Sequence, residues 1–209
     1  MLTALSSGFL LGLSCALAPG PLLALLLAQT LRHGPREGCK VALAPLVTDA
    51  PIILVALALA AEAARVRAAL AVLSLAGGLF VLYLAVEALR APPLAAAREA
   101  ARPGSWLKAV LVNLLNPHPW LFWMTVGAAM LARARTVSNW AVAGFLGMFY
   151  LLLVGSKLLL ALGSARSRQF LSGRGYRRLL QAFAIMLAAF AVLLLREGLS
   201  RLSPTALPP

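Results

Sequence analysis

Charged side chains are scarce in this sequence. Only 12% of its 209 residues are Asp, Glu, Lys or Arg, whereas 62% are hydrophobic and the mean hydropathy is +0.90. An ordinary soluble domain is about one quarter charged, so this composition excludes that class. The apolar runs also lack the period-two alternation of barrel strands, which excludes a membrane β-barrel.

Cysteine is scarcer still. The sequence has two, Cys15 and Cys39, which is too few for a disulfide framework and gives no metal-ligand spacing. Membrane thiol carriers need two thiols within bonding distance, and the second half of the chain has none. No Ser/His/Asp set has a spacing that suggests a hydrolase. We therefore expect no enzyme, no metal and no cofactor, and keep a thiol–disulfide electron carrier only as an unfavoured alternative.

Long apolar runs are what the sequence has in abundance. A helix of about 20 residues crosses the hydrocarbon core of a membrane. Six runs approach or exceed that length: residues 2–31, 41–61, 68–86, 109–132, 136–165 and 179–195. Only two of them carry a charge, Asp49 in the second and Lys157 in the fifth. The sequence therefore predicts an all-α membrane protein with six transmembrane helices.

The net charge of +13 resides mainly in short connections between these runs. Loops one, three and five carry twelve basic residues, and the opposite side carries six. By the positive-inside rule, this bias predicts cytoplasmic odd-numbered loops and both termini outside. It also makes anionic lipid headgroups the expected partner of the basic loops, and not nucleic acid.

The six runs divide into two groups of three. A basic linker rich in proline and alanine, residues 91–105, separates a first repeat at 1–90 from a second at 106–200, and a short tail follows at 201–209. Because each group has an odd number of spans, the second lies inverted relative to the first. We expect two inverted three-helix repeats.

Each repeat opens with a run that is broken by a Pro-x-Pro pair. Residues 19–21, Pro-Gly-Pro, break the first run, and residues 116–119, Asn-Pro-His-Pro, break the fourth. A proline inside a helix costs about 3 kcal/mol or more, and the freed backbone groups need protein or a wet cavity instead of lipid. Many membrane-helix prolines determine only shape, but matching breaks in two repeats favour a transport site near the midplane.

Two charges are expected deep in the membrane. Asp49 lies about eight residues into its run, where an ionised carboxylate costs on the order of 2.5–3.5 kcal/mol. It is either a protonated cap on a kink between Pro45 and Pro51 or a site for an amine or a proton. Lys157 either reaches water along its own stem, pairs with Asp49, or binds a carboxylate.

Polar side chains at the second break allow similar alternatives. Asn116 either satisfies the backbone of the broken helix or binds a ligand. His118 is a candidate proton relay, because imidazole is the side chain that most often exchanges protons near neutral pH. The sequence alone does not choose between these alternatives.

Five motifs in order resemble the LysE-type (lysine exporter) translocators. They are APGPLLAL, APLVTDAPIIL, GGLFVLYLAVEALR, NLLNPHPWLFWMTVG and YLLLVGSKLLLAL, between about residue 4 and residue 198. The resemblance implies a bacterial inner-membrane exporter of amino acids or related small metabolites, driven by the proton gradient or by exchange. With the residues above, it gives this expected substrate or proton pathway: Pro19, Gly20, Pro21, Asp49, Asn116, Pro117, His118 and Lys157.

Other membrane functions stay open at this point. A small-ion carrier or channel also needs polar residues that face a pathway, although channel residues usually act as rings in oligomers. We expect an amino-acid-like substrate and membrane lipids as partners, and we keep a homodimer as an alternative to a monomer.

Overall fold

The computed structural model describes residues 1–18, 20–59, 63–90, 104–170 and 173–202. Within these ranges every element is helical: α1 (Leu2–Leu17), α2 (Pro21–His33), α3 (Pro35–Leu59), α4 (Ala63–Leu89), α6 (Ser105–Leu115), α7 (Pro117–Phe122), a π-helical turn η1 (Trp123–Gly127), α8 (Ala128–Val137), α9 (Asn139–Phe170) and α10 (Gly173–Leu202). This confirms the all-α prediction. Most of the predicted linker and all but two residues of the predicted tail lie outside the described residues.

Four of these helices are long and apolar enough to cross a membrane. Their apolar segments are Pro35–Ala56, Ala68–Leu89, Asn139–Ser164 and Leu180–Leu202. A fifth span results if α1 and α2, which meet at an angle of 63°, are taken together. The expected fourth run, residues 109–132, is instead divided among α6, α7, η1 and α8. The chain is therefore a multi-pass membrane protein, and its long spans number four or five in the described residues, where six were expected.

The break between α1 and α2 follows from local chemistry. The backbone leaves the helical region at Ala18 (ψ 121°) and is fully extended at Gly20 (φ −164°, ψ 172°). Pro21 then occupies the first position of α2, where its missing N–H would have had no helical partner in any case. Pro21 thus begins the second helix of the broken pair, as its position in the sequence suggests.

The second break uses a side-chain cap. Asn116 is extended (φ −81°, ψ 121°), and its Oδ1 accepts a hydrogen bond of 3.1 Å from the backbone N–H of His118. Pro117 occupies the first position of α7, and α7 passes after one and a half turns into η1. The sequence alternative that Asn116 satisfies the broken backbone is therefore confirmed for its oxygen atom.

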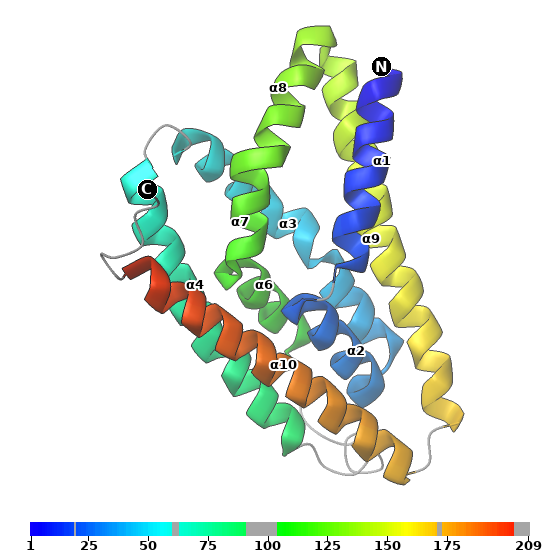
Figure 1. Cartoon of the computed structure of the whole chain (residues 1–209). Helices are drawn as coiled ribbons and strands as arrows, with labels where there is room; N and C mark the ends of the chain where they lie inside the picture. The colour runs from blue at the N-terminus through cyan, green and yellow to red at the C-terminus, as the bar shows by residue number, and fades with distance from the viewer. Residues whose placement is uncertain (19, 60–62, 91–103, 171–172, 203–209) are drawn as a thin grey trace.

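Small residues let the long helices approach closely. In Figure 1, α1 runs alongside α9, and α4 runs alongside α10. A methyl group added at Gly12 of α1 would meet the backbone of Phe149 in α9. One added at Gly78 of α4 would meet Leu195 in α10. Close approach through small residues is the usual packing mode of membrane helices, where apolar burial supplies little driving force.

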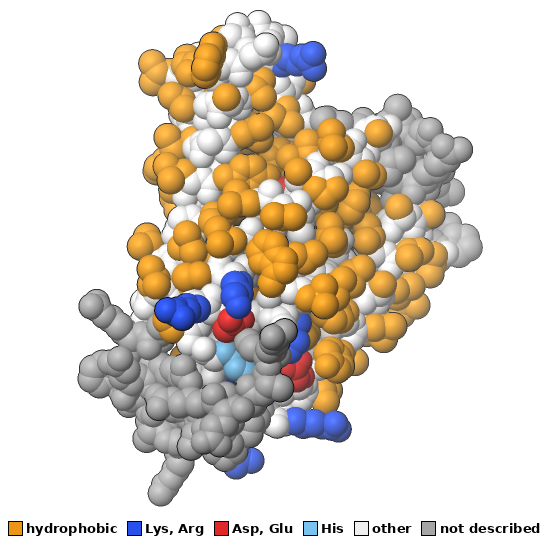
Figure 2. Space-filling view, turned by 180° about the vertical axis from the view of Figure 1, so that it is seen from behind, with side chains coloured by type: hydrophobic (Ala, Val, Ile, Leu, Met, Phe, Trp, Pro, Cys, Tyr) orange, Lys and Arg blue, Asp and Glu red, His pale blue; other side chains and the backbone are white. Residues whose placement is uncertain are grey.

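The outer surface suits a lipid environment. Large apolar side chains such as Leu54 and Leu159 lie on the surface, at 71% and 72% exposure. Figure 2 shows that apolar side chains cover the middle of one face, while Lys and Arg side chains lie towards its two ends. An apolar middle with basic ends matches the hydrocarbon core and headgroup regions of a bilayer.

An ion-pair cluster ties three elements together at one end of the bundle. Glu87 Oε1 in α4 accepts bonds from Arg32 Nη1 in α2 at 3.2 Å and from Lys108 Nζ in α6 at 2.6 Å. Next to it, Ser105 Oγ in α6 donates to Gln29 Oε1 in α2 at 3.1 Å, and both residues are buried. These polar groups bond to one another where α2 and α6 meet.

Candidate functional site

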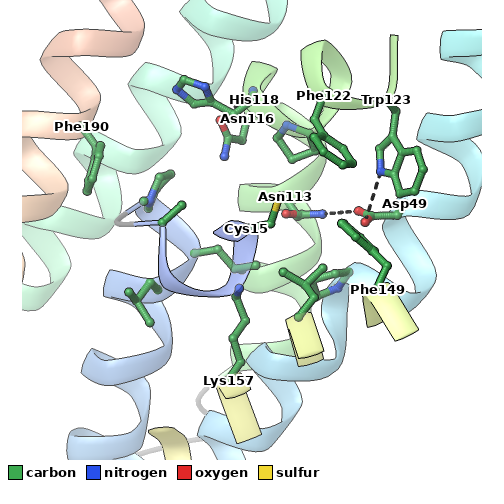
Figure 3. Close-up of a pocket in the computed structure, with 18 residues that line it drawn as sticks. Cys15, Asp49, Asn113, Asn116, His118, Phe122, Trp123, Phe149, Lys157 and Phe190 are labelled. Carbon is green, nitrogen blue, oxygen red and sulfur yellow. Dashed lines mark hydrogen bonds between the residues drawn. The ribbon is translucent and has the colours of Figure 1, made fainter. Parts of the chain in front are cut away.

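A cavity of about 440 Å³ lies between the two breaks. Its walls come from both segments of the first broken pair, from α3, from the α6–α7–η1 region and from α9 and α10. The residues that line it are Cys15, Ala18, Gly20, Pro21, Leu22, Leu23, Pro45, Asp49, Asn113, Asn116, His118, Pro119, Phe122, Trp123, Phe149, Leu153, Lys157 and Phe190. Figure 3 shows the polar side chains converging on this space from opposite sides.

Asp49 is held by three side chains on three different elements. Its Oδ1 accepts from Asn113 Nδ2 of α6 at 3.0 Å. Its Oδ2 accepts from Trp123 Nε1 of η1 at 3.4 Å and from Tyr150 Oη of α9 at 3.2 Å. The residue is only 4% exposed. Among the described residues, the partners of this carboxylate are therefore side chains across the bundle, and not the backbone of a kink in its own helix.

The helix that carries Asp49 is continuous. We expected an irregular helix there, because Pro45 and Pro51 flank the carboxylate, but α3 runs through both prolines. Pro45 stands one turn before Asp49 and lines the same cavity. Its missing N–H and the bulk of its ring loosen the ladder of backbone bonds without ending the helix.

Asn113 links two neighbouring side chains of α3. Its Nδ2 donates to Thr48 Oγ1 at 2.6 Å as well as to Asp49, and Thr48 Oγ1 itself donates to the Ala44 carbonyl at 3.0 Å. Asn113 is buried. The resulting chain of bonds fixes the carboxylate relative to both α3 and α6, so the second half of the molecule positions a charge carried by the first.

Aromatic rings form one wall of the cavity. Trp123 stacks edge-on against Phe122 and Phe149, with ring centroids 5.1 and 5.4 Å apart, and Tyr150 packs against Phe149 at 5.2 Å. The π-helical turn η1 begins at Trp123. Single π turns inside helical segments are frequent at functional sites, and this one presents the indole N–H to Asp49.

Lys157 enters the cavity from α9 and is 4% exposed. Figure 3 shows its amino group directed into the cavity, towards the break between α1 and α2. Among the described residues, no hydrogen bond from Lys157 and no ion pair within 4.0 Å is present. Pairing with Asp49, one of the sequence alternatives, is therefore not seen. Nor does its stem carry the charge to the outer surface.

The structure brings most of the predicted pathway residues together. Six of the eight line the cavity, namely Gly20, Pro21, Asp49, Asn116, His118 and Lys157. Pro117 is buried at the start of α7 behind this lining, and Pro19 lies outside the described residues. His118 is exposed and reaches the cavity from its rim.

Sequence reasoning missed several residues that surround Asp49 and Lys157. None of Asn113, Trp123 and Tyr150 was among the predicted pathway residues, although all three donate to Asp49. Tyr150 precedes Lys157 by seven residues, which places both on one helix face, so that spacing was a usable signal. The contact between Trp123 and Asp49 spans 74 positions, and no local pattern encodes it.

The described residues contain no group of three His, Cys, Asp or Glu that could hold a metal ion. Cys15 and Cys39 are both free thiols, and they pack against different hydrophobic clusters.

A family model described as LysE type translocator matches residues 13–198, which is most of the chain. No curated protein and no solved structure matched. The matched region contains both breaks and every residue that lines the cavity.

Proposed function

Because this chain belongs to the LysE type translocator family, we propose that it exports amino acids or related small metabolites across the bacterial inner membrane. Members of this family are membrane transporters of amino acids or similar solutes, not enzymes. Export is driven by the proton gradient or by exchange. The substrate pathway runs through the cavity between the two breaks.

The observation that carries this proposal is a buried carboxylate and a buried amino group in one cavity without an ion pair between them. Asp49 and Lys157 come from different halves of the chain and line the same space. Ionisable residues inside a membrane are costly and typically mark substrate or ion pathways. A solute with both charges would find complementary groups there.

The packing of the two halves supports an alternating-access mechanism. The first helix of each half contacts the middle helix of the other, α1 with α9 and α6 with α3, while the last helices α4 and α10 contact each other. This pattern is what a pseudo-two-fold relation between inverted repeats would produce. Rocking of residues 1–90 against 106–200 around the cavity would then open it to each side in turn, with cytoplasmic odd-numbered loops.

In this mechanism Asp49 binds a proton or the amine of the substrate. Three donors already stabilise its carboxylate, and a carboxylate has about four acceptor sites. One site therefore remains for a proton or an ammonium group. Pro19, Gly20, Pro21, Asn116 and Pro117 form the breaks that expose backbone to the pathway, and His118 stands at its rim.

The test is efflux from proteoliposomes loaded with a mixture of the twenty common amino acids, with and without an imposed proton gradient. We expect selective, saturable loss of one or a few of them. Asp49→Asn is expected to reduce that efflux about 10- to 100-fold, the scale of losing a charged hydrogen-bonding partner. Glu197→Gln, which removes a charge at the end of α10, is the matched control.

Two results would contradict the proposal. Full export by a well-folded Asp49→Asn protein would remove Asp49 from the pathway. Flux that does not saturate and does not distinguish solutes would favour the alternative of a small-ion carrier or channel.

A further inference from the structure

We infer that the cavity holds the carboxylate of a zwitterionic, neutral amino acid between the Lys157 amino group and the free amides at the start of α2. This inference rests on the proposed function and names the substrate class of the same site. The amine of that substrate lies towards Asp49, and its side chain lies against the apolar wall.

The first argument is the isolation of Lys157. The residue is 4% exposed, and among the described residues its amino group donates to none. Buried charges are normally paired, because removing an ammonium group from water without compensation is costly. The ionisable groups that interact electrostatically with Lys157 are Cys15 and Asp49. The carboxylate of Asp49 is not within ion-pair distance of the Lys157 amino group. An anionic ligand group would complete this site.

The second argument is independent and comes from the backbone. The first amides of a helix have no partner within it, and α2 begins with a proline, after a glycine that supplies no side-chain cap. Among the described residues, the first amide of this helix that finds a backbone acceptor is that of Ala24, which donates to the Gly20 carbonyl at 3.1 Å. Leu22 and Leu23 precede it, and both line the cavity.

The Lys157 amino group and the amides at the start of α2 are both complementary to a carboxylate. A helix N-terminus presents N–H groups and the positive end of the helix dipole, which favours a carboxylate. A lysine directed towards the same break adds a full positive charge. In transporters built from inverted repeats, half-helix N-termini commonly face anionic substrate groups.

The rest of the lining limits the side chain of the substrate. Asp49 is the only carboxylate among the described residues that line the cavity. A basic amino acid would leave its second positive charge without a partner, next to Lys157. The remaining wall is largely apolar, with Phe122, Phe149 and Leu153. A neutral amino acid satisfies both charges and covers this wall.

Ligand binding to the purified full-length protein in detergent tests the inference. The probes are L-leucine, L-phenylalanine and L-threonine, each compared with its carboxamide, which keeps the amine but lacks the negative charge. We expect at least one amino acid to bind about 10- to 100-fold more tightly than its carboxamide, as for hydrogen bonds to charged groups. Lys157→Gln should abolish that preference, and Lys157→Arg should retain most of it.

Lys40→Gln is the matched control, because Lys40 is 52% exposed and pairs with Glu37 away from the cavity. It should behave like the wild type. If Lys157→Gln aggregates, Lys157→Met gives the same comparison with a side chain suited to a buried position. Equal binding of amino acid and carboxamide by the wild type, or an unchanged preference in the neutral variant, would overturn the inference.

Transport by the same proteins separates this inference from the proposed function. Carboxylate-dependent binding without efflux would support the subsite and refute the exporter. Efflux with no preference for the carboxylate would refute the subsite alone. Binding of none of the probes, or tighter binding of L-lysine than of every neutral probe, would overturn the inference as stated.

Discussion

At the scale of the residue, the central feature is a carboxylate whose donors come from distant parts of the chain. Asp49 is the only aspartate in the sequence, and Asn113, Trp123 and Tyr150 all donate to it. Each donor disperses negative charge that the membrane would otherwise penalise. In the mechanism proposed above, this carboxylate exchanges a proton or an ammonium group.

Tyr150→Phe tests the contribution of one donor. The substitution removes the hydroxyl that lies 3.2 Å from Asp49 Oδ2 and leaves the ring packing in place. We expect a loss of about 1.5–3 kcal/mol of stability, the range for hydrogen bonds to charged groups, measured by thermal or denaturant unfolding in detergent.

Tyr83→Phe provides the control, because Tyr83 is 58% exposed on α4. Asp49→Asn combined with Tyr150→Phe should cost less than the sum of the single changes, since the two groups interact. Strict additivity would show that the hydroxyl does not act through the carboxylate.

At the scale of the element, small residues determine how closely the long helices α1 and α9 pack against each other. Gly12 of α1 lies against the backbone of Phe149, and Gly147 of α9 has no neighbouring atom within 4 Å of an added methyl group. Both glycines lie in helices that pack on each other. At Gly12 the partner helix occupies the space that an added methyl group would need, whereas at Gly147 that space is open.

Gly12→Ala is expected to destabilise the protein by about 1–3 kcal/mol, because the methyl group has no room between α1 and α9. Gly147→Ala should instead be neutral or stabilising by up to about 1 kcal/mol, since alanine favours the helix. Unfolding temperatures of the two variants in the same detergent give the comparison. Equal changes in unfolding temperature for the two variants would mean that Gly12 does not determine the spacing between α1 and α9.

At the scale of the whole molecule, the ion-pair cluster around Glu87 joins the two halves at one end of the bundle. The Glu87 side chain is 24% exposed, and Arg32 and Lys108 reach it from α2 and α6. One carboxylate offsets two cations there. The cluster thus connects the first broken segment to the second through α4.

Glu87→Gln is expected to cost about 1–3 kcal/mol of stability, less than a fully buried pair because the site is partly wet. The loss arises from two cations that are left close together. Glu197→Gln is the control: its pair with Arg201 lies within one helix and should contribute no more than about 0.5 kcal/mol. High salt should reduce the difference in the free energy of unfolding between the wild type and Glu87→Gln. A larger loss of stability for Glu197→Gln than for Glu87→Gln would contradict this account.

The sequence by itself determined the helical class, the membrane environment and the positions of both breaks. These properties depend on hydropathy, run length and proline chemistry, which act locally. It also pointed to Asp49 and Lys157, because an ionisable residue within an apolar run is conspicuous. Six of its eight pathway residues line one cavity.

Tertiary structure alone decided how those residues meet. The donors to Asp49 lie between 64 and 101 positions away along the chain, and Trp123 donates to it from a π-helical turn that the local sequence pattern did not predict. The segments that follow the Asn116–Pro117 break likewise pack against distant elements, η1 against α3 and α8 against α9. Local pattern specifies which groups must avoid lipid, but only the packed bundle specifies which partner each group finds.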